Sequence, residues 1–411
     1  MAPPESQPAG TGVSFALTDE QAALQRATAA LLRRHVLPHE SLLREHAQLP
    51  WSLVQSLRAE ARAAGVYGPQ ISRRWGGLGA DWRTVAVVFE EAGTSLLGPP
   101  ALNCAAPDEG NIHLLQLVAT ADQQERFLAP LARGEVRSCF AMTEPAPGAG
   151  SDPSMLMTRA RRDGDGWVLD GHKWYITGAR GAAFAIVMAR TSDGDAARSG
   201  ATMFLVPTDA DGFEIVREIG SLDHTFSGGH CEVRLSNCRV PSDDVLGEVD
   251  RGFEYAQLRL APARLTHCMR WLGVARRAFE IAADWANRRT SGGKPLGDHQ
   301  MVQAMLADSA IDLHAARLMI WHAAWVLDTG GPARAESQMA KVFVSEAVNR
   351  VVDRAMQICG ALGISDDLPL GLFYREVRPF RIYDGPSEVH RAAIARRVLR
   401  RAAEQARPEP E

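Results

Sequence analysis

The residues with the clearest capacity for chemistry lie near the C-terminal end, in the run Tyr383-Asp384-Gly385-Pro386. A carboxylate that a Gly-Pro turn holds just before a helix can act as a general base. The same aspartate could instead cap the following helix by accepting its first backbone N–H groups. The run therefore predicts either proton transfer at Asp384 or an ordinary helix cap, and the residue types alone leave both open.

Three further stretches have the residue types of ligand sites. The loop from Ala141 to Asp152 is rich in glycine and small residues, so a ligand could approach its backbone closely, although it could also be a plain surface loop. Lys173 to Gly178 sets an aromatic ring beside a hydroxyl, which could flank a planar cofactor or simply pack in a sheet. Arg288 to Pro295 joins arginines to a glycine turn, which suits a phosphate or the C-terminal end of a helix.

The elements that must position these residues change in type along the chain. The first third is expected to be helical, and its first helix opens on a capping-box pattern in which Gln21 lies three residues after Thr18. The expected helices cover Thr18 to His35, Trp51 to Ala64, Trp82 to Gly93 and Asp122 to Ala132.

Strand patterns begin near Ser138. Asp170-Gly171 lies between two aromatic-rich runs, Trp167 to Leu169 and Trp174 to Ile176, which predicts a β-hairpin turning at that dipeptide. Cys231 to Leu235 alternates apolar and polar residues, as a half-buried strand does. Short apolar runs predict two more strands, Ala182 to Ala189 and Ala201 to Pro207.

Helical periodicity returns after Gly252. Leu258, Leu265, Leu272 and Phe279 recur every seven residues, as in a long helix of a bundle. Three more helices are expected at His299 to Leu327, Ala335 to Leu362 and Pro386 to Ala406.

This order predicts an α+β multidomain chain rather than a Rossmann fold or TIM barrel, in which strands and helices alternate throughout. We expect a disordered lead-in (1–16), an N-terminal α-helical domain (17–137), a central β-barrel-like or sandwich domain (138–246) and a C-terminal four-helix bundle (247–411).

Composition excludes several classes of function. The 411 residues carry a net charge of −4, which is not the basic footprint of a nucleic-acid-binding protein. The six cysteines are scattered and form no C-x-x-C pair, so neither a zinc site nor a disulfide framework is expected. This use of cysteine favours a cytoplasmic protein. No apolar run approaches the length of a membrane span, and the N-terminus lacks the pattern of a signal peptide.

Taken in order, the motifs resemble those of the acyl-CoA dehydrogenase family across almost the whole chain, from about Leu17 to Ala402. The matching anchors are Trp75-Gly76-Gly77-Leu78-Gly79, Met142-Thr143-Glu144-Pro145, Gly150-Ser151-Asp152, Trp174 to Thr177, Arg239-Val240-Pro241, Gln357-Ile358-Cys359-Gly360 and Tyr383-Asp384-Gly385. Gly228-Gly229-His230 and Thr266 to Arg270 further resemble the branch whose animal members are fused to an aminoglycoside-phosphotransferase-like domain. This chain has no room for that domain, so a free-standing bacterial form is expected.

The resemblance implies an FAD-dependent enzyme of fatty acid β-oxidation that dehydrogenates an acyl-CoA thioester to the trans-2-enoyl-CoA. It also implies a homotetramer or homodimer, with electron-transferring flavoprotein as the electron acceptor. Cofactor-binding roles fall on Met142, Thr143, Ser151, Tyr175 and Thr177 at the flavin end, on Arg289, Gln300, Gln357 and Gly360 at the pyrophosphate and adenosine end, and on Glu388. Substrate-binding roles fall on Ser151, Arg264, Tyr383 and Gly385.

In this family the base occupies one of two positions. One corresponds to Asp384, and the other to Ala263 on the long helix, where alanine cannot act; the resemblance therefore favours Asp384. Most relatives carry glutamate there, so an aspartate one methylene shorter suggests a site suited to branched or substituted acyl groups. Other departures are the two extra residues Ala146-Pro147 and the residues Gly292, Ala361 and Pro386.

Four alternative functions differ from this one in features that the sequence shows. A nitroalkane oxidase also uses an aspartate base, and an acyl-CoA oxidase would share the flavin chemistry but is usually a longer chain. A DNA-binding alkylation-response flavoprotein would need a basic C-terminal extension, whereas this chain ends in Arg-Pro-Glu-Pro-Glu. A non-catalytic scaffold would not be expected to combine a base with a flavin-binding set.

Overall fold

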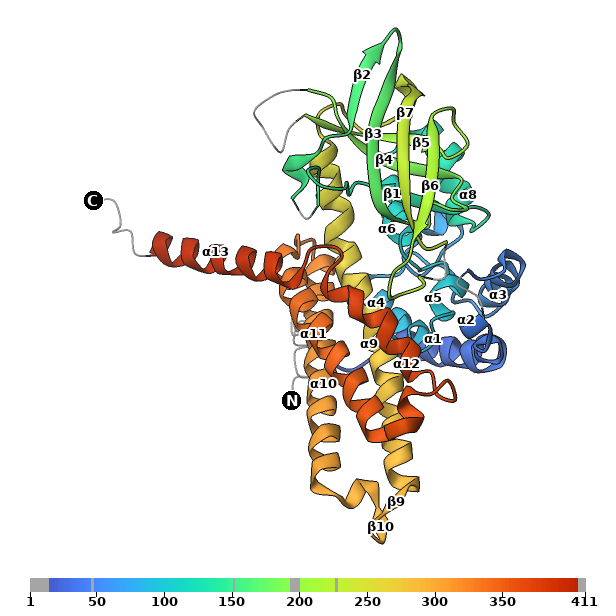
Figure 1. Ribbon diagram of the computed structural model, residues 1–411, viewed down its shortest axis with the longest axis vertical. Helices are drawn as coiled ribbons and strands as arrows, with labels where there is room; N and C mark the ends of the chain where they lie inside the picture. Colours follow the sequence, from blue (N-terminus) through green and yellow to red (C-terminus); the bar gives the residue numbers. More distant parts are fainter. Residues whose placement is uncertain (1–14, 46–47, 151, 193–199, 226–227, 406–411) are drawn as a thin grey trace, which may run out of the picture.

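The computed structural model describes residues 15–45, 48–150, 152–192, 200–225 and 228–405. A helical N-terminal part, a middle β-sheet and a C-terminal set of long helices follow one another along the chain (Figure 1). This succession confirms the expected fold class. Most of the expected lead-in, together with Ser151 and Ala406, lies outside the described residues.

The N-terminal helices contribute to two apolar cores, one shared with the C-terminal helices and one shared with the sheet. Their first turn contains the predicted capping box, because Gln21 N donates to Thr18 Oγ1 at 3.2 Å while Thr18 N donates to Gln21 Oε1 at 3.1 Å. The helices are α1 (Asp19–Leu31), α2 (Leu42–Glu45), α3 (Trp51–Ala63), α4 (Trp82–Ala92), α5 (Gly98–Ala101), α6 (Asp108–Val118), α7 (Ala121–Gln123) and α8 (Ala129–Ala132).

The middle part is one sheet of eight strands in the described chain. The strand order is β6-β7-β3-β2-β4-β5-β8, with β1 parallel to β4. The strands are β1 (Ser138–Ala141), β2 (Arg159–Asp163), β3 (Gly166–Thr177), β4 (Phe184–Arg190), β5 (Ala201–Pro207), β6 (Phe213–Ile219), β7 (His230–Pro241) and β8 (Val245–Leu246).

The hairpin prediction at Asp170-Gly171 was wrong. Both aromatic runs belong to the single strand β3, and the hairpin turn lies earlier, where Asp163 of β2 pairs with Gly166 of β3. Gly171 has a different purpose. A Cβ there would lie 2.3 Å from Thr158 Oγ1, so the glycine lets a neighbouring segment cross the strand closely.

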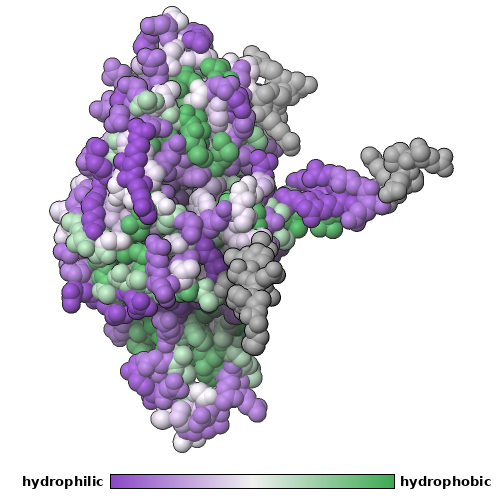
Figure 2. All heavy atoms as spheres, turned by 180° about the vertical axis from the view of Figure 1, so that it is seen from behind, coloured by the Kyte–Doolittle hydropathy of each residue, from purple (hydrophilic) through white to green (hydrophobic). Residues whose placement is uncertain are grey.

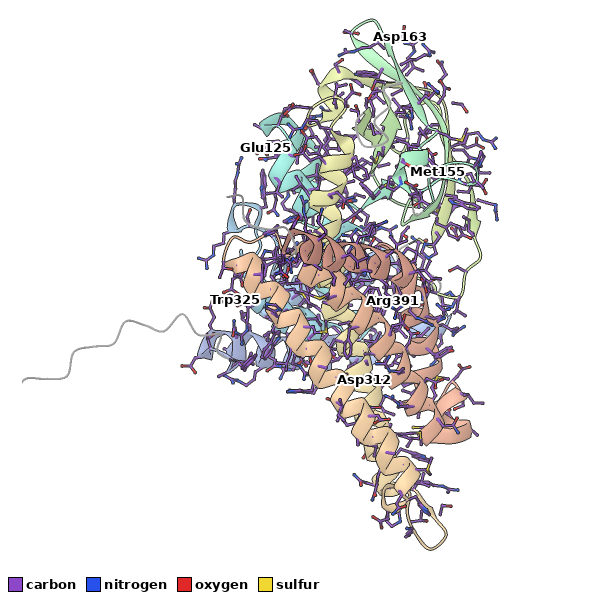
Figure 3. The ribbon with its side chains drawn as sticks, turned by 90° about the vertical axis from the view of Figure 1, so that its left-hand side faces the viewer. Glu125, Met155, Asp163, Asp312, Trp325 and Arg391 are labelled. Carbon is purple, nitrogen blue, oxygen red and sulfur yellow. The ribbon has the colours of Figure 1, made fainter. Side chains whose placement is uncertain are left out.

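The C-terminal part is built on three long antiparallel helices. They are α9 (Gly252–Arg288), α10 (Gln300–Asp328) and α11 (Arg334–Cys359), followed by α12 (Leu370–Val377) and α13 (Ser387–Gln405). Asp312 of α10 bonds Arg350 and Arg354 of α11, and Figure 3 shows this aspartate midway along the bundle. The four predicted helices are confirmed, but α13 contacts mainly α11 at its start and then projects from the body (Figure 1).

The helical parts also share a close backbone contact. A Cβ on Gly273 of α9 would meet the Glu90 carbonyl oxygen of α4 at 2.1 Å, so glycine is what allows the two helices to touch there. In the described residues all six cysteines are buried and free of disulfides, as expected. None of the described helices is both long and apolar enough to cross a membrane.

Candidate active site

Three helices fix the turn that carries Asp384. The Asp384 carbonyl oxygen accepts from Arg264 Nε of α9 at 2.9 Å and from His390 Nε2 of α13 at 3.0 Å. Lys341 of α11 donates to the Gly385 carbonyl oxygen at 2.7 Å. Asp384 has a left-handed φ of 53°, a strained conformation for a residue other than glycine, and these bonds hold it there.

The Asp384 carboxyl group is partly buried and faces His267. Its side chain is 18% exposed, and Oδ2 lies 3.4 Å from His267 Nε2. Within the described residues no protein acceptor binds the backbone N–H of Asp384. The aspartate is therefore not a simple N-cap, because its carboxyl group bonds no backbone N–H of α13 in the described chain.

Buried cations surround this carboxyl group. Burial lowers the pKa of Arg259 and of Arg264, while the charge of Asp384 acts in the opposite direction. Burial also lowers the pKa of Lys341 to about 8. None of these three cations lies within ion-pairing distance of a carboxylate among the described side chains. The site therefore has a positive potential that favours negative charge developing on a group bound beside Asp384.

Neither His267 nor Lys341 was predicted from the sequence to take part in chemistry. The available signal was the spacing from Ala263 to His267, one helical turn, which places both on one face of α9. Ala263 itself is buried. Tyr383, expected near substrate, packs against His267 and Phe380, and its hydroxyl accepts from Trp271 Nε1 at 2.5 Å.

Four of the residues predicted at the flavin end, Met142, Thr143, Tyr175 and Thr177, lie on or next to strands of the sheet, and Ser151 lies outside the described residues. Trp174 N donates to the Thr143 carbonyl oxygen at 3.0 Å, which brings the segment of Met142 and Thr143 against β3. A bulge between Lys173 and Ile176 gives Tyr175 a left-handed φ of 53° and leaves it 49% exposed. Such a bulge re-aims a side chain out of the regular ladder.

Thr177 has a polar partner that the sequence did not suggest. Its Oγ1 lies 2.9 Å from His230 Nδ1, and His230 Nε2 lies 3.1 Å from Asp223 Oδ2. The next residue, His224, donates its N–H to Glu376 of α12 at 2.7 Å. The flavin-end set is thereby connected to the helices that lead into the Asp384 turn.

A buried ion pair holds the loop after β1. Lys173 Nζ lies 2.9 Å from Glu144 Oε1 and also donates to the carbonyl oxygens of Met142 and Met188. Glu144 accepts from the backbone N–H groups of Met157 and Thr158 at 2.6 and 2.8 Å. Figure 3 places Met155, in this segment, on the same side of the molecule as Arg391 in the first turns of α13.

The residues predicted at the adenosine end gather elsewhere. Arg289 follows the end of α9, Gln300 begins α10, and Gln357 and Gly360 lie where α11 ends. Because the three helices are antiparallel, these termini share the end of the bundle farthest from the sheet (Figure 1). That end lies roughly 36 Å along α9 from Arg264. Glu388 is exposed on the first turn of α13.

Family models for the three parts of this fold match the chain. The N-terminal, middle and C-terminal domain models of acyl-CoA dehydrogenase match residues 18–135, 139–238 and 250–399. The chain belongs to the acyl-CoA dehydrogenase family. It is accordingly an FAD-dependent oxidoreductase.

Individual relatives are similar over most of the chain. "Probable acyl-CoA dehydrogenase FadE2" of Mycobacterium tuberculosis is 40% identical over 85% of this chain and 86% of its own. Acyl-CoA dehydrogenase family member 11 of Homo sapiens is 36% identical over 90% of this chain, which spans about half (49%) of that relative. The crystal structure of an acyl-CoA dehydrogenase from Geobacillus kaustophilus has a TM-score of 0.84 at 26% identity, covering 94% of this chain and 100% of its own.

The residues present fit FAD. The outward-facing Tyr175 and the hydroxyl of Thr177 offer an aromatic face and a polar contact for a ring system. Gly360, with φ 61° and ψ −137°, has a conformation open essentially only to glycine, and its position has open space where a Cβ would be. Arg289, exposed directly after the end of α9, supplies a guanidinium, which suits a pyrophosphate.

Proposed function

We propose that this acyl-CoA dehydrogenase family member oxidises an acyl-CoA thioester between Cα and Cβ, with Asp384 as the base that takes the α-proton. The observation that carries the proposal is the Asp384 turn. Bonds from three helices hold it in a strained conformation, its carboxyl group is partly exposed, and its backbone N–H has no protein acceptor in the described chain.

The geometry suits removal of a weakly acidic proton. The carboxylate would take the α-proton, while the Asp384 N–H would donate to the thioester oxygen as negative charge develops there. The buried charges of Arg264, Arg259 and Lys341 favour that charge. Bound FAD would supply the acceptor for the hydride that leaves Cβ. Met142, Thr143, Tyr175 and Thr177, with Ser151, would hold its flavin end.

The substrate class follows from the length of the base. An aspartate reaches one methylene less far than a glutamate, so the α-carbon must lie closer to the turn. We propose that the acyl group is branched or substituted. Electron-transferring flavoprotein would then accept the electrons. This part of the proposal is supported by the resemblance and by residue type.

We further propose a homotetramer or homodimer. Within one protomer, the flavin-end residues lie far from the adenosine-end residues, by much of the length of α9. The adenosine-end residues are Arg289, Gln300, Gln357 and Gly360. A second copy could bring these two sets to one cofactor. Large apolar side chains exposed on α10 and on the projecting α13 support such an interface, among them Met301 (75%), Ile311 (65%) and Leu399 (69%). In Figure 2 part of the bundle half is apolar, and further apolar patches lie over the half that carries the sheet.

Anaerobic mixing with acyl-CoA thioesters tests the function. The purified protein is mixed with straight, 2-methyl-branched and hydroxylated acyl-CoAs while the visible flavin absorbance is followed. Bleaching by one class is expected, and Asp384→Asn should slow it about 10²- to 10⁴-fold. Asp366→Asn, at an exposed carboxylate far from the turn, is the matched control. If no thioester bleached the flavin-loaded parent but a nitroalkane reduced it, oxidation of nitroalkanes would replace this proposal.

A further inference from the structure

His267 has the geometry of a residue that acts on the base without touching the reacting atoms. It lies on α9, its Nε2 is 3.4 Å from Asp384 Oδ2, and its ring packs against Phe380 and Tyr383. A separation of 3.4 Å is long for a hydrogen bond, but such contacts commonly shorten when a substrate closes a site. Whether Nε2 carries the proton, and so can donate to Asp384, depends on the hydrogen bond made by the other ring nitrogen, Nδ1.

Arg270 fixes the tautomer of His267. Arg270 Nη2 lies 3.1 Å from His267 Nδ1, and because a guanidinium can only donate, Nδ1 must accept. The proton of the neutral ring is therefore on Nε2, directed at the Asp384 carboxylate. Arg270 is itself held in place, since Nη1 donates to the Cys104 carbonyl oxygen at 2.8 Å and both terminal nitrogens lie 3.3 Å from Glu109 Oε1.

The surroundings also keep His267 uncharged. Burial and the charges of Arg270, Arg259 and Lys341 lower its pKa well below the ordinary value. A cationic histidine so close would bind the carboxylate as an ion pair and make it a weaker base. A neutral N–H donor can orient the carboxylate with less loss of basicity. The hydroxyl of Thr266 also donates to Glu109 at 2.7 Å. Thr266, His267 and Arg270 therefore form one polar network on adjacent positions of α9.

We infer that His267 is a positioning residue: held as the Nε2–H tautomer by Arg270 and Glu109, it orients the Asp384 carboxylate for removal of the substrate's α-proton. This inference rests on the proposed function and adds a residue to it. The proton passes from the α-carbon to an Asp384 oxygen, and His267 keeps its own proton throughout.

Other charged groups meet the same carboxyl group and must be kept constant in any test. The ionisable neighbours of Asp384 or His267 are Arg259, Arg264, Cys268 and Arg270 of α9, Glu109 of α6, Lys341 of α11, His390 of α13 and Tyr383 of the turn. Substitutions are therefore confined to His267, with His390 as the comparison.

Two substitutions separate orientation from packing. His267→Phe keeps a ring against Phe380 and Tyr383 but removes the donor. His267→Gln returns an N–H donor near the position of Nε2. His390→Gln alters a histidine that contacts the Asp384 backbone carbonyl instead of the carboxylate, so it controls for general loosening of the turn.

The measurement is the pH dependence of kcat/KM, followed by anaerobic flavin bleaching with the flavin-loaded protein. Loss of the donor disfavours the ionised carboxylate, so in His267→Phe the acidic limb should move up by about one pH unit. The rate should fall about 10- to 100-fold. His267→Gln should restore most of the limb. His390→Gln should lower the rate, because its bond helps to hold the Asp384 turn, but it should leave the pH position of the limb unchanged.

A second readout isolates proton transfer from hydride transfer. A thioester with no hydrogen on Cβ is incubated with enzyme in D2O, and mass spectrometry follows deuterium entering the α-position. His267→Phe should slow this exchange in parallel with bleaching. Two results would show that the inference about His267 is wrong while the proposed function stands, provided that the parent bleaches normally. One is that His267→Phe shows no shift of the acidic limb, and the other is that His267→Gln behaves like His267→Phe. If no thioester bleaches the parent, the proposed function and this inference both fail.

Discussion

Replacing Lys173 with methionine is expected to destabilise the protein through the partner left behind. Lys173 and Glu144 are buried, with side chains 0% and 2% exposed, and their charged atoms are 2.9 Å apart. Burial lowers the pKa of Lys173 to about 8, which shows how strongly the interior opposes its charge. Lys173→Met removes that charge but leaves the Glu144 carboxylate without its cation.

The structure sets the size of the loss. Breaking one side of a buried pair typically costs about 3–5 kcal/mol. Glu144 would keep its backbone donors at Met157 and Thr158, so the lower end, about 3 kcal/mol, is expected. Because the same carboxylate anchors the loop that carries Met142 and Thr143, retention of FAD should fall as well.

Unfolding of the parent, Lys173→Met, Glu144→Gln and the double variant is measured at pH 8 and pH 5.5. In Lys173→Met the buried carboxylate should hold a proton more tightly in the folded state than in the unfolded one, so its cost falls as pH is lowered. The double variant should be more stable than Lys173→Met because no lone charge remains. Lys294→Met, at an exposed lysine, is the control and should change stability by at most about 0.5 kcal/mol. An equal loss at both pH values would refute the charge argument.

Two other substitutions test particular features of the fold. Burial raises the pKa of Glu376 from 4.5 to about 7, so the folded state holds a proton that the unfolded state releases between these values, and stability should fall by about 3 kcal/mol as pH rises through that window. Glu376→Gln keeps an acceptor for the His224 N–H without a charge, so its unfolding temperature should not show that decline and should exceed the parent's at pH 8. Gly273→Ala should destabilise by about 2 kcal/mol because its Cβ would meet the Glu90 carbonyl oxygen, whereas Gly371→Ala, with open space at its Cβ, should be neutral or stabilising in the same thermal melts.

Local signals in the sequence predicted most elements of the fold. The capping box at Thr18 and the seven-residue repeat of α9 depend on neighbours along the chain, and both are present in the structure. Asp170-Gly171 was misleading because its glycine serves a contact with Thr158, which the sequence cannot show. The direction of α13 depends on its packing contact with α11, which is a tertiary interaction that the local sequence does not show.

The candidate site was predicted less completely than the fold. Asp384 was singled out by residue type, turn and resemblance, and its role stays a prediction. His267 and Lys341 were not assigned chemistry because their contacts with Asp384 and Gly385 join elements distant in the sequence. The contact of His390 depends on how the Asp384 turn folds back against the start of α13. A buried histidine on an apolar helix face gives no sign of its tautomer until its neighbours are known.

The burial of the cysteines has a consequence for the life of the enzyme. Reduced flavin that meets oxygen produces hydrogen peroxide, and a thiol attacks peroxide only as its thiolate. Cys268 lies next to His267 in the chain, and burial raises its pKa to about 12, as it does for Cys104. These sulfurs therefore remain protonated and screened from solvent, so peroxide in solution has no thiolate to react with at these positions. Oxidation of either cysteine to sulfenic acid would require local unfolding that exposes the thiol. The extent of oxidation at these two positions would therefore measure how often the protein has unfolded locally.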